Sequence, residues 1–316
     1  MCIRDSYYGY DHIDMVTGHG DQAGGHYRQW FRSRHSNWRE LTDRGNQLPH
    51  NYSCPQAFRT PITEDSYPTF FVRDRAVDFL HSVKDDATPF FSFVSFPDPH
   101  HPFNPPGKYW DMYSPDEFEL PVRCADHKNP PPPLLHAKSM FEKGELPAVP
   151  QITFMASEQH IREAMALTAG MITMIDDAVG DIVDTLKRTG QYENTVIVFN
   201  SDHGDFLGDF DLLLKGAWPK DAITRVPMIW SDPQSRRAQL SSALTSTVDI
   251  APTILERAGI RPYHGMQGRS FIDATVGNAG VRDDLMIEFN DGGRRCLLYT
   301  SPSPRDATLS RMPSSA

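Results

Sequence analysis

Apolar residues recur with helical spacing in three parts of the chain. Over residues 69–84 and 157–189 they fall on one face at intervals of three and four, and Gly190 stands where the second segment would end. A shorter apolar segment over residues 251–258 follows Asp249, a residue type that caps helices. These patterns predict three helices, of which the one over residues 157–189 is the longest.

Uninterrupted apolar runs form a second pattern, and they are too short for helices. They cover residues 90–96, 195–199, 226–230 and 285–289, with a shorter run near residues 13–16. Runs of this kind are typical of strands that are buried on both faces. Because they alternate with helices, we predict an α/β fold with a largely parallel sheet sandwiched by helices.

Two long polar segments separate these elements. Residues 7–60 mix aromatic residues, glycine and histidine without a clear period, which indicates irregular structure at the surface. Residues 97–150 are rich in proline, especially over residues 130–133, so we expect a long surface loop without long helices.

The two ends of the chain have a different character. Residues 1–6 lead into no element, and residues 296–316 are rich in serine and proline without a period. Both resemble translated sequencing-adapter sequence. We therefore expect one partial domain over residues 7–295, truncated at both ends.

Composition narrows the class of protein. The 316 residues carry a net charge of −10, which excludes a nucleic-acid binder with a broad basic face, and no apolar run is long enough to span a membrane. An acidic protein that binds an anionic ester needs a local cluster of cations. The four cysteines show no paired spacing, so Cys54 and Cys124 are expected to be free thiols.

Candidate chemistry lies where two predicted strands end, as is usual in open parallel sheets. The run over residues 195–199 leads into Asn200-Ser201-Asp202-His203-Gly204. Asp202 offers hard oxygen ligands for a cation such as Ca²⁺, and His203 could add a ring nitrogen, which leaves Mn²⁺ and Zn²⁺ open. The alternative is a turn that Asp202 caps, with a surface histidine beside it.

Further candidates flank this segment. Lys215 follows by a short loop and is a compact charge suited to an anionic ester, although a solvated surface lysine is the alternative. His100 and His101 follow the run over residues 90–96 and could transfer a proton, or they could be ordinary loop histidines. Arg225 is read as an ion-pair partner inside the fold.

Three segments in this order resemble the sulfatase family. They are PFFSFVSFPDPHHPFNPPGKY, NTVIVFNSDHGDFLGDFDLLLKGAWPKDAITRVPMIW and STVDIAPTILERAGI, and the resemblance extends over residues 7–295. It implies an alkaline-phosphatase-like fold and hydrolysis of a small-molecule or carbohydrate sulfate ester. It also implies a bound Ca²⁺ ion and a formylglycine nucleophile made from Cys or Ser.

The resemblance assigns roles to four residues of this chain. Asp202 and His203 match metal ligands, Lys215 matches a lysine that contacts the sulfate group, and His100 matches a catalytic histidine near the ester oxygen that also binds substrate. The formylglycine motif and two further acidic ligands have no match here. The segment that begins at Cys54 lacks the motif's proline and Ser-Arg, so it is not assigned as the nucleophile.

These gaps lead us to expect no turnover of an aryl sulfate by this chain alone. Two other functions stay open on the sequence. One is a phosphodiesterase or phosphonate monoester hydrolase of the same superfamily, and the other is a non-catalytic sulfatase-like binding protein. The residues do not specify the compartment, the oligomeric state or the natural substrate.

Overall fold

The longest element is the helix α5 (Glu158–Arg188), which agrees with the predicted helix over residues 157–189. Ser157 caps it, because its side chain accepts a hydrogen bond from the His160 N–H at 3.2 Å. Gly190 follows its end with a φ of +75°, a conformation that glycine adopts without a steric penalty. The apolar period and the cap are both local signals, which is why the sequence located this helix well.

The structure is a computed structural model that describes residues 9–146, 152–216, 218–277, 280–291 and 294–300. The chain divides into two compact units, each built from two stretches of sequence. Unit 1 comprises residues 1–121 and 156–193, and unit 2 comprises residues 122–155 and 194–316. None of the helices in the described ranges is both long and apolar enough to cross a membrane.

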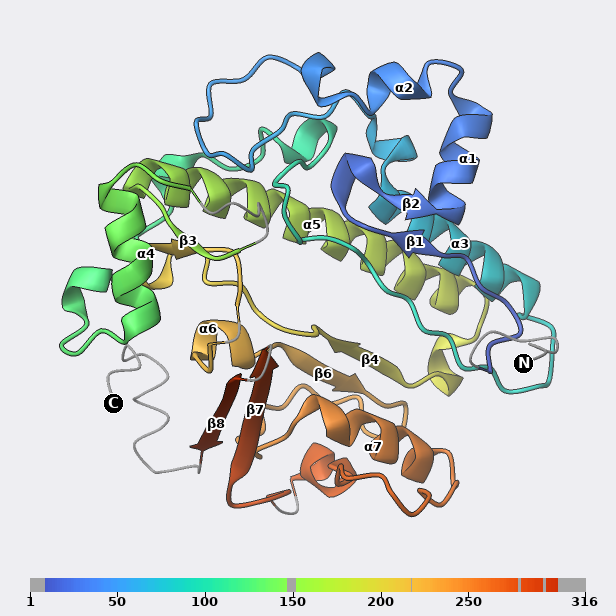
Figure 1. Ribbon diagram of the computed structural model, residues 1–316. Coiled ribbons are helices and arrows are strands. Elements are labelled where there is room, and N and C mark those ends of the chain that lie inside the picture. The colour runs from blue at the N-terminus through green and yellow to red at the C-terminus, as the bar shows by residue number, and fades with distance from the viewer. Residues whose placement is uncertain (1–8, 147–151, 217, 278–279, 292–293, 301–316) are drawn as a thin grey trace, which may run out of the picture. The chain divides into compact units, whose positions relative to one another are not determined.

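Unit 1 is mainly helical and is built on the packing of α3 against α5 (Figure 1). The elements that accompany α5 are β1 (Val16–Thr17), β2 (Gly24–Gly25), α1 (His26–Arg34), α2 (Trp38–Leu41) and α3 (Pro68–Ser82). The buried face of α5 includes Ile161, Leu167, Met171 and Met174. Ile172 of the same helix is 53% exposed, so not every apolar residue of α5 lies on its buried face.

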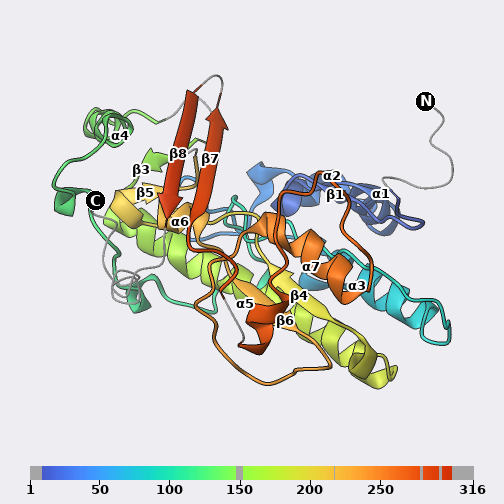
Figure 2. The same cartoon turned by 90° about the horizontal axis from the view of Figure 1, so that it is seen from below.

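Unit 2 combines short helices with strand pairs, and Figure 2 shows its β7–β8 pair from below. Its elements are α4 (Pro132–Glu142), β3 (Phe154–Met155), β4 (Ile197–Asn200), β5 (Leu212–Leu213), α6 (Asp221–Thr224), β6 (Met228–Ser231), α7 (Ile250–Arg257), β7 (Leu285–Asp291) and β8 (Arg294–Thr300). One apolar cluster in this unit surrounds Phe206, Phe210 and Leu212. These three residues belong to the segment that joins β4 to α6.

The α/β class is confirmed, but the strand arrangement differs from the expected parallel sheet. In the described residues every named strand belongs to a two-stranded antiparallel pair, such as β4 with β6, where Asn200 lies opposite Met228. Residues 90–96 form no strand, and Phe91 and Phe93 are 59% and 69% exposed. An apolar run predicts burial but does not specify a hydrogen-bonding partner, and no described strand lies beside this one.

The two polar segments contain helices that the sequence did not predict. Helices α1 and α2 lie within residues 7–60, where aromatic and arginine residues hide the period. Helix α4 lies within residues 97–150 and begins at Pro132, since proline at the first helical turn needs no N–H partner. The expectation of a loop without long helices was therefore wrong.

The ends of the chain are described only in part. Residues 294–300 form β8, so the beginning of the segment expected to lack structure is paired with β7. Residues 1–6 and 301–316 lie outside the described residues, and the expected domain boundaries stay predictions.

Candidate active site

The loop after β4 is shaped by its own polar side chains. The Ser201 hydroxyl donates to the His203 carbonyl oxygen at 2.9 Å. The Asp202 Oδ1 atom accepts a hydrogen bond from the His203 N–H, also at 2.9 Å. Short polar side chains that bond to nearby backbone stabilise local bends, and the chain bends at Asp202, directly after the strand.

Gly204 allows this loop to approach α6 closely. Its N–H donates to the Ile223 carbonyl oxygen at 2.8 Å, and a Cβ atom at this position would lie 1.8 Å from the Ala222 carbonyl oxygen. No side chain can be placed there without moving the backbone. The glycine thus fixes the distance between α6 and the loop that carries Asp202 and His203.

The His203 ring presents one defined nitrogen. Its Nδ1 atom lies 2.8 Å from the Gly204 carbonyl oxygen, and a carbonyl can only accept, so Nδ1 carries the proton. The Nε2 atom lies 3.5 Å from Oδ2 of Asp202. A backbone carbonyl that holds one ring nitrogen in this way is the usual arrangement behind a metal-binding histidine.

Asp205 is a further polar group of the loop, and the sequence analysis did not single it out. Burial raises the pKa of its carboxyl, and the opposing influences include the Leu207 N–H at 3.0 Å and the positive charge of Lys215. Burial lowers the pKa of Lys215, whereas Asp202 and Asp205 raise it. The lysine charge therefore lies in the field of both carboxylates.

Lys215 is held in place through its backbone. The Phe206 N–H donates to the Leu214 carbonyl oxygen at 2.9 Å, which closes the loop just before the lysine. Next to it, β5 pairs with β3, and the Thr153 hydroxyl donates to the Lys215 carbonyl oxygen at 2.5 Å. The position of the ammonium group thus depends on a segment some sixty residues earlier in the chain.

Asp202 and His203 form only part of a metal site. Asp202 is 84% exposed and His203 is 38% exposed, so both can reach a ligand. In the described part of the chain, no group of three or more His, Cys, Asp or Glu side chains could hold a metal ion. Since Ca²⁺ takes six to eight oxygen ligands, the pair fits a cation as a contribution to a larger donor set.

His100 belongs to unit 1 and shows the same ring arrangement as His203. Its Nδ1 atom lies 2.5 Å from the His101 carbonyl oxygen, so Nδ1 again carries the proton and Nε2 is the atom that can exchange one. Its ring stacks on His19, with centroids 3.4 Å apart and planes 9° apart. The sequence analysis missed His19, although its glycine neighbours, Gly18 and Gly20, both have positive φ.

A buried polar group supports the turn that carries His100. The Asp98 carboxylate accepts a hydrogen bond from the Thr69 hydroxyl, and the Tyr67 hydroxyl lies 3.4 Å away. Tyr67 also donates to Oδ1 of Asn104 at 2.9 Å. Burial raises the pKa of Asp98 to about 6, with the hydrogen bonds from Thr69 and Tyr67 acting in the opposite direction.

Two further residues that the sequence analysis considered, Cys54 and Arg225, show no sign of a catalytic role. The Cys54 thiol is free and buried, and burial raises its pKa to about 12, which describes an inert thiol. Arg225 ends α6 and is exposed, so the expected ion pair inside the fold is wrong. The structure brings Asp202, His203 and Lys215 together in unit 2 and places His100 and His101 in unit 1.

Comparison with known proteins identifies the family. The sulfatase family model matches residues 6–260. An arylsulfatase of Clostridium perfringens is 29% identical over 78% of this chain and 49% of its own length. The multifunctional alkaline phosphatase superfamily protein PehA of Trinickia caryophylli is 30% identical over 83% of this chain and 54% of its own length.

The fold is also similar to that of a solved structure. The phosphonate monoester hydrolase of Agrobacterium radiobacter superposes with a TM-score of 0.65 at 25% identity, over 85% of this chain and 54% of that one. This chain spans about half the length of the curated relatives that it matches. Because the family model covers most of the chain, in agreement with the resemblance in sequence, the chain belongs to the sulfatase family.

Proposed function

We propose that the protein containing this chain hydrolyses a sulfate ester. Asp202 and His203 would bind a divalent cation, most simply Ca²⁺, and Lys215 and His100 would contact the sulfate group. The observation that carries the proposal is the grouping of a carboxylate, an oriented ring nitrogen and a partly buried ammonium group in the loops that follow β4. The family match over residues 6–260 supports it.

Each side chain has a distinct task in this proposal. The cation would polarise the sulfate group and stabilise its developing charge. Lys215 presents a point charge to an anionic oxygen, and its partial burial strengthens that interaction compared with one in bulk water. His100, with Nδ1–H held by a carbonyl, can donate a proton to the oxygen of the departing alcohol when Nε2 is also protonated, and its ring then returns to the neutral form.

The nucleophile is proposed to be the formylglycine that the family resemblance implies. Cys54 is not its source, because the thiol is buried and the Cys54 N–H donates to Glu163 at 2.7 Å within the fold. The other residues described above would therefore act on a substrate that is attacked by a group supplied elsewhere in the protein.

The test uses the longest reading frame that encodes this chain, assayed with 4-nitrophenyl sulfate in the presence of Ca²⁺. Asp202→Asn and Lys215→Ala should each lower kcat/KM by about 10- to 100-fold, the usual effect of weakening a metal site or an oxyanion contact. Lys187→Ala is the control, since Lys187 is exposed and pairs with Asp184 at 2.9 Å. A folded parent protein without turnover, or equal losses in all three variants, would refute the proposal.

A second function is hydrolysis of a phosphonate monoester or phosphodiester. The similar solved structure from Agrobacterium radiobacter is a phosphonate monoester hydrolase, and the Trinickia relative is named as multifunctional; both support this alternative. Like a sulfate monoester, these substrates present one negative charge to the same cation and lysine. Comparing kcat/KM of one preparation on 4-nitrophenyl sulfate and bis(4-nitrophenyl) phosphate decides between them.

A further inference from the structure

Three arginines of unit 1 form an exposed basic patch in this acidic protein. Arg32 and Arg34 belong to α1 and Arg39 belongs to α2, two helices that are labelled in Figure 1. All three arginines are exposed. Residues 26–44 contain five arginines and only two carboxylates, whereas the whole chain has a net charge of −10. We call Arg32, Arg34 and Arg39 the arginine patch.

The guanidinium groups of the patch are ordered by indole rings. Arg32 lies 3.9 Å and Arg39 lies 4.6 Å from the ring centroid of Trp38, and Arg34 lies 5.0 Å from that of Trp30. Stacking of this kind reduces the entropy that each long side chain loses on binding and leaves the in-plane N–H groups available. The patch is therefore organised before a ligand arrives.

No carboxylate neutralises these three arginines. Among the ion pairs of the described residues, none includes Arg32, Arg34 or Arg39. By contrast, many other cations of unit 1 pair with acids, for example Arg73 with Asp181 at 3.0 Å. Free N–H groups in a fixed plane suit the oxygens of sulfate groups, which can accept two hydrogen bonds from one guanidinium.

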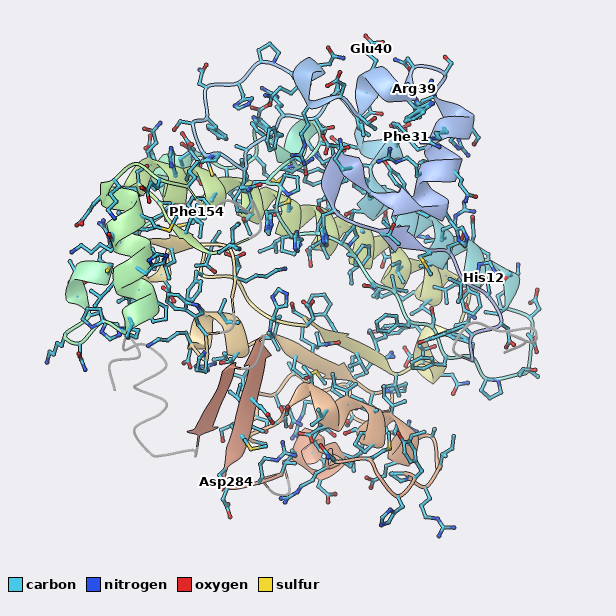
Figure 3. The ribbon with its side chains drawn as sticks, in the orientation of Figure 1. His12, Phe31, Arg39, Glu40, Phe154 and Asp284 are labelled. Atoms are coloured by element: carbon cyan, nitrogen blue, oxygen red, sulfur yellow. The ribbon has the colours of Figure 1, made fainter. Side chains whose placement is uncertain are left out.

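The surface around the patch argues against insertion into a membrane. Phe31 of α1 is fully buried, whereas Arg39 of α2 is exposed; both side chains are labelled in Figure 3. Trp30 and Trp38 are half-buried beneath the guanidinium groups, and in this fully described stretch no large hydrophobic side chain between residues 26 and 47 is exposed. A helix that binds lipid needs an exposed apolar face, which is missing here.

We propose that the arginine patch binds a sulfated polysaccharide and retains a polymeric substrate near the enzyme. The choice of sulfate as the anion rests on the proposed function, but the binding itself does not require turnover. Several regularly spaced sulfates on one chain would engage the three guanidinium groups together, and their counterions would be released. The substrate class is accordingly a sulfated polymer rather than a small aryl sulfate.

The test measures the binding of this chain to dextran sulfate and to unsulfated dextran of the same length, by isothermal titration calorimetry at several salt concentrations. The triple variant Arg32→Gln, Arg34→Gln, Arg39→Gln should weaken the binding of dextran sulfate about tenfold or more and reduce its salt dependence, since charge contacts dominate polyanion affinity. The corresponding triple Lys variant keeps the charge but loses the planar groups. Its affinity for dextran sulfate should therefore lie between those of the parent protein and the Gln variant.

The matched control changes the net charge by the same amount at other positions of the chain. Lys84→Gln, Lys138→Gln, Lys187→Gln removes three exposed cations that already have carboxylate partners, and it should change affinity less than about twofold. Equal losses in both triple variants, or equal binding of unsulfated dextran, would overturn the proposal. Tighter binding to phosphatidylserine vesicles than to dextran sulfate would also overturn it. Patch-dependent binding by this chain, together with a folded full-length protein that hydrolyses no sulfate ester, would sustain this proposal and contradict the proposed function alone.

Discussion

The rings of His100 and His203 are both oriented by a hydrogen bond to nearby backbone. In both, Nδ1 donates to the carbonyl oxygen of the next residue, at 2.5 and 2.8 Å, so the sequence-adjacent backbone selects the tautomer. The residue types alone indicated candidate chemistry, but not which ring nitrogen would be available. That detail depends on the local backbone conformation, which the sequence patterns do not determine.

The buried carboxyl of Asp98 should make stability depend on pH. Its pKa rises from 3.8 to about 6 on folding, so between these values the folded state binds more protons than the unfolded state. Stability contributed by the neutral group is therefore lost as pH rises through this window. We expect Asp98→Asn to gain stability relative to the parent protein from about pH 4 to pH 7, by up to about 3 kcal/mol.

Urea unfolding midpoints of both proteins at pH values across this window provide the measurement. Taking the difference between variant and parent removes the contribution of the other titrating groups. Asp85→Asn is the control, because the Asp85 side chain is 90% exposed and should give a difference that does not change with pH. A pH-independent difference for Asp98→Asn as well would contradict the burial of a carboxyl with a raised pKa.

Gly204 and Gly180 should respond in opposite ways to alanine. At Gly204 a Cβ atom would lie 1.8 Å from the Ala222 carbonyl oxygen, so we expect Gly204→Ala to lower the free energy of unfolding by about 1–3 kcal/mol. At Gly180, inside α5, no atom lies within 4 Å, and Gly180→Ala should stabilise by about 0.5–1 kcal/mol. Thermal and urea unfolding check both signs, and a neutral Gly204→Ala would show that the loop is not packed tightly on α6.

At the scale of elements, the sequence predicted what depends on local periodicity. Helices α3 and α5 follow from apolar spacing, and α5 also from its cap at Ser157. The run over residues 90–96 was misassigned, because strand formation needs a neighbour that periodicity cannot supply. Helix α4 was missed because the proline run was read as a break, whereas Pro132 begins the helix.

Glu163 of α5 should anchor the segment around Cys54. Its carboxylate is buried and accepts hydrogen bonds from the N–H groups of Ser53 at 2.9 Å and Cys54 at 2.7 Å. Glu163→Ala leaves both donors without this acceptor, so we expect a loss of about 2–3 kcal/mol of stability. Hydrogen exchange of these two amides should accelerate together.

The control for this substitution is Glu256→Ala. Glu256 is exposed on α7, and its replacement should change stability by less than about 0.5 kcal/mol. If Glu163→Ala were equally mild, or if the two amides exchanged as slowly as before, the carboxylate would not hold the segment in solution.

At the scale of the whole molecule, the sequence named candidate site residues but could not predict which of them lie close together. Asp202, His203 and Lys215 meet in unit 2 because the backbone path from Phe206 to Leu214 returns the chain to the end of β4. The sequence analysis missed Asp205 because this residue stands out through its burial, and the burial of a polar loop residue cannot be predicted from its sequence pattern. His19 could be identified only from the structure, which shows that its ring stacks on that of His100.

The limited donor set leads to a prediction for this chain. Two protein ligands are far fewer than Ca²⁺ requires, so we expect a dissociation constant weaker than about 1 mM and no hydrolysis of 4-nitrophenyl sulfate. Calorimetry with CaCl₂ and thermal unfolding with and without Ca²⁺ measure the binding. A rise in Tm with Ca²⁺ that Asp202→Asn abolishes would contradict the prediction, as would measurable hydrolysis.

The loop before Lys215 also has a consequence for the order of folding. Leu207, Phe210, Asp211 and Leu214 all have positive φ, a conformation that is unfavourable for residues other than glycine. Phe210 and Leu214 are nevertheless almost completely buried, so side-chain packing must compensate for the unfavourable backbone. Because Phe206, Phe210 and Leu212 of this segment are members of the apolar cluster, the loop and the cluster should form together during folding. On this view Lys215 reaches its position only when that cluster assembles.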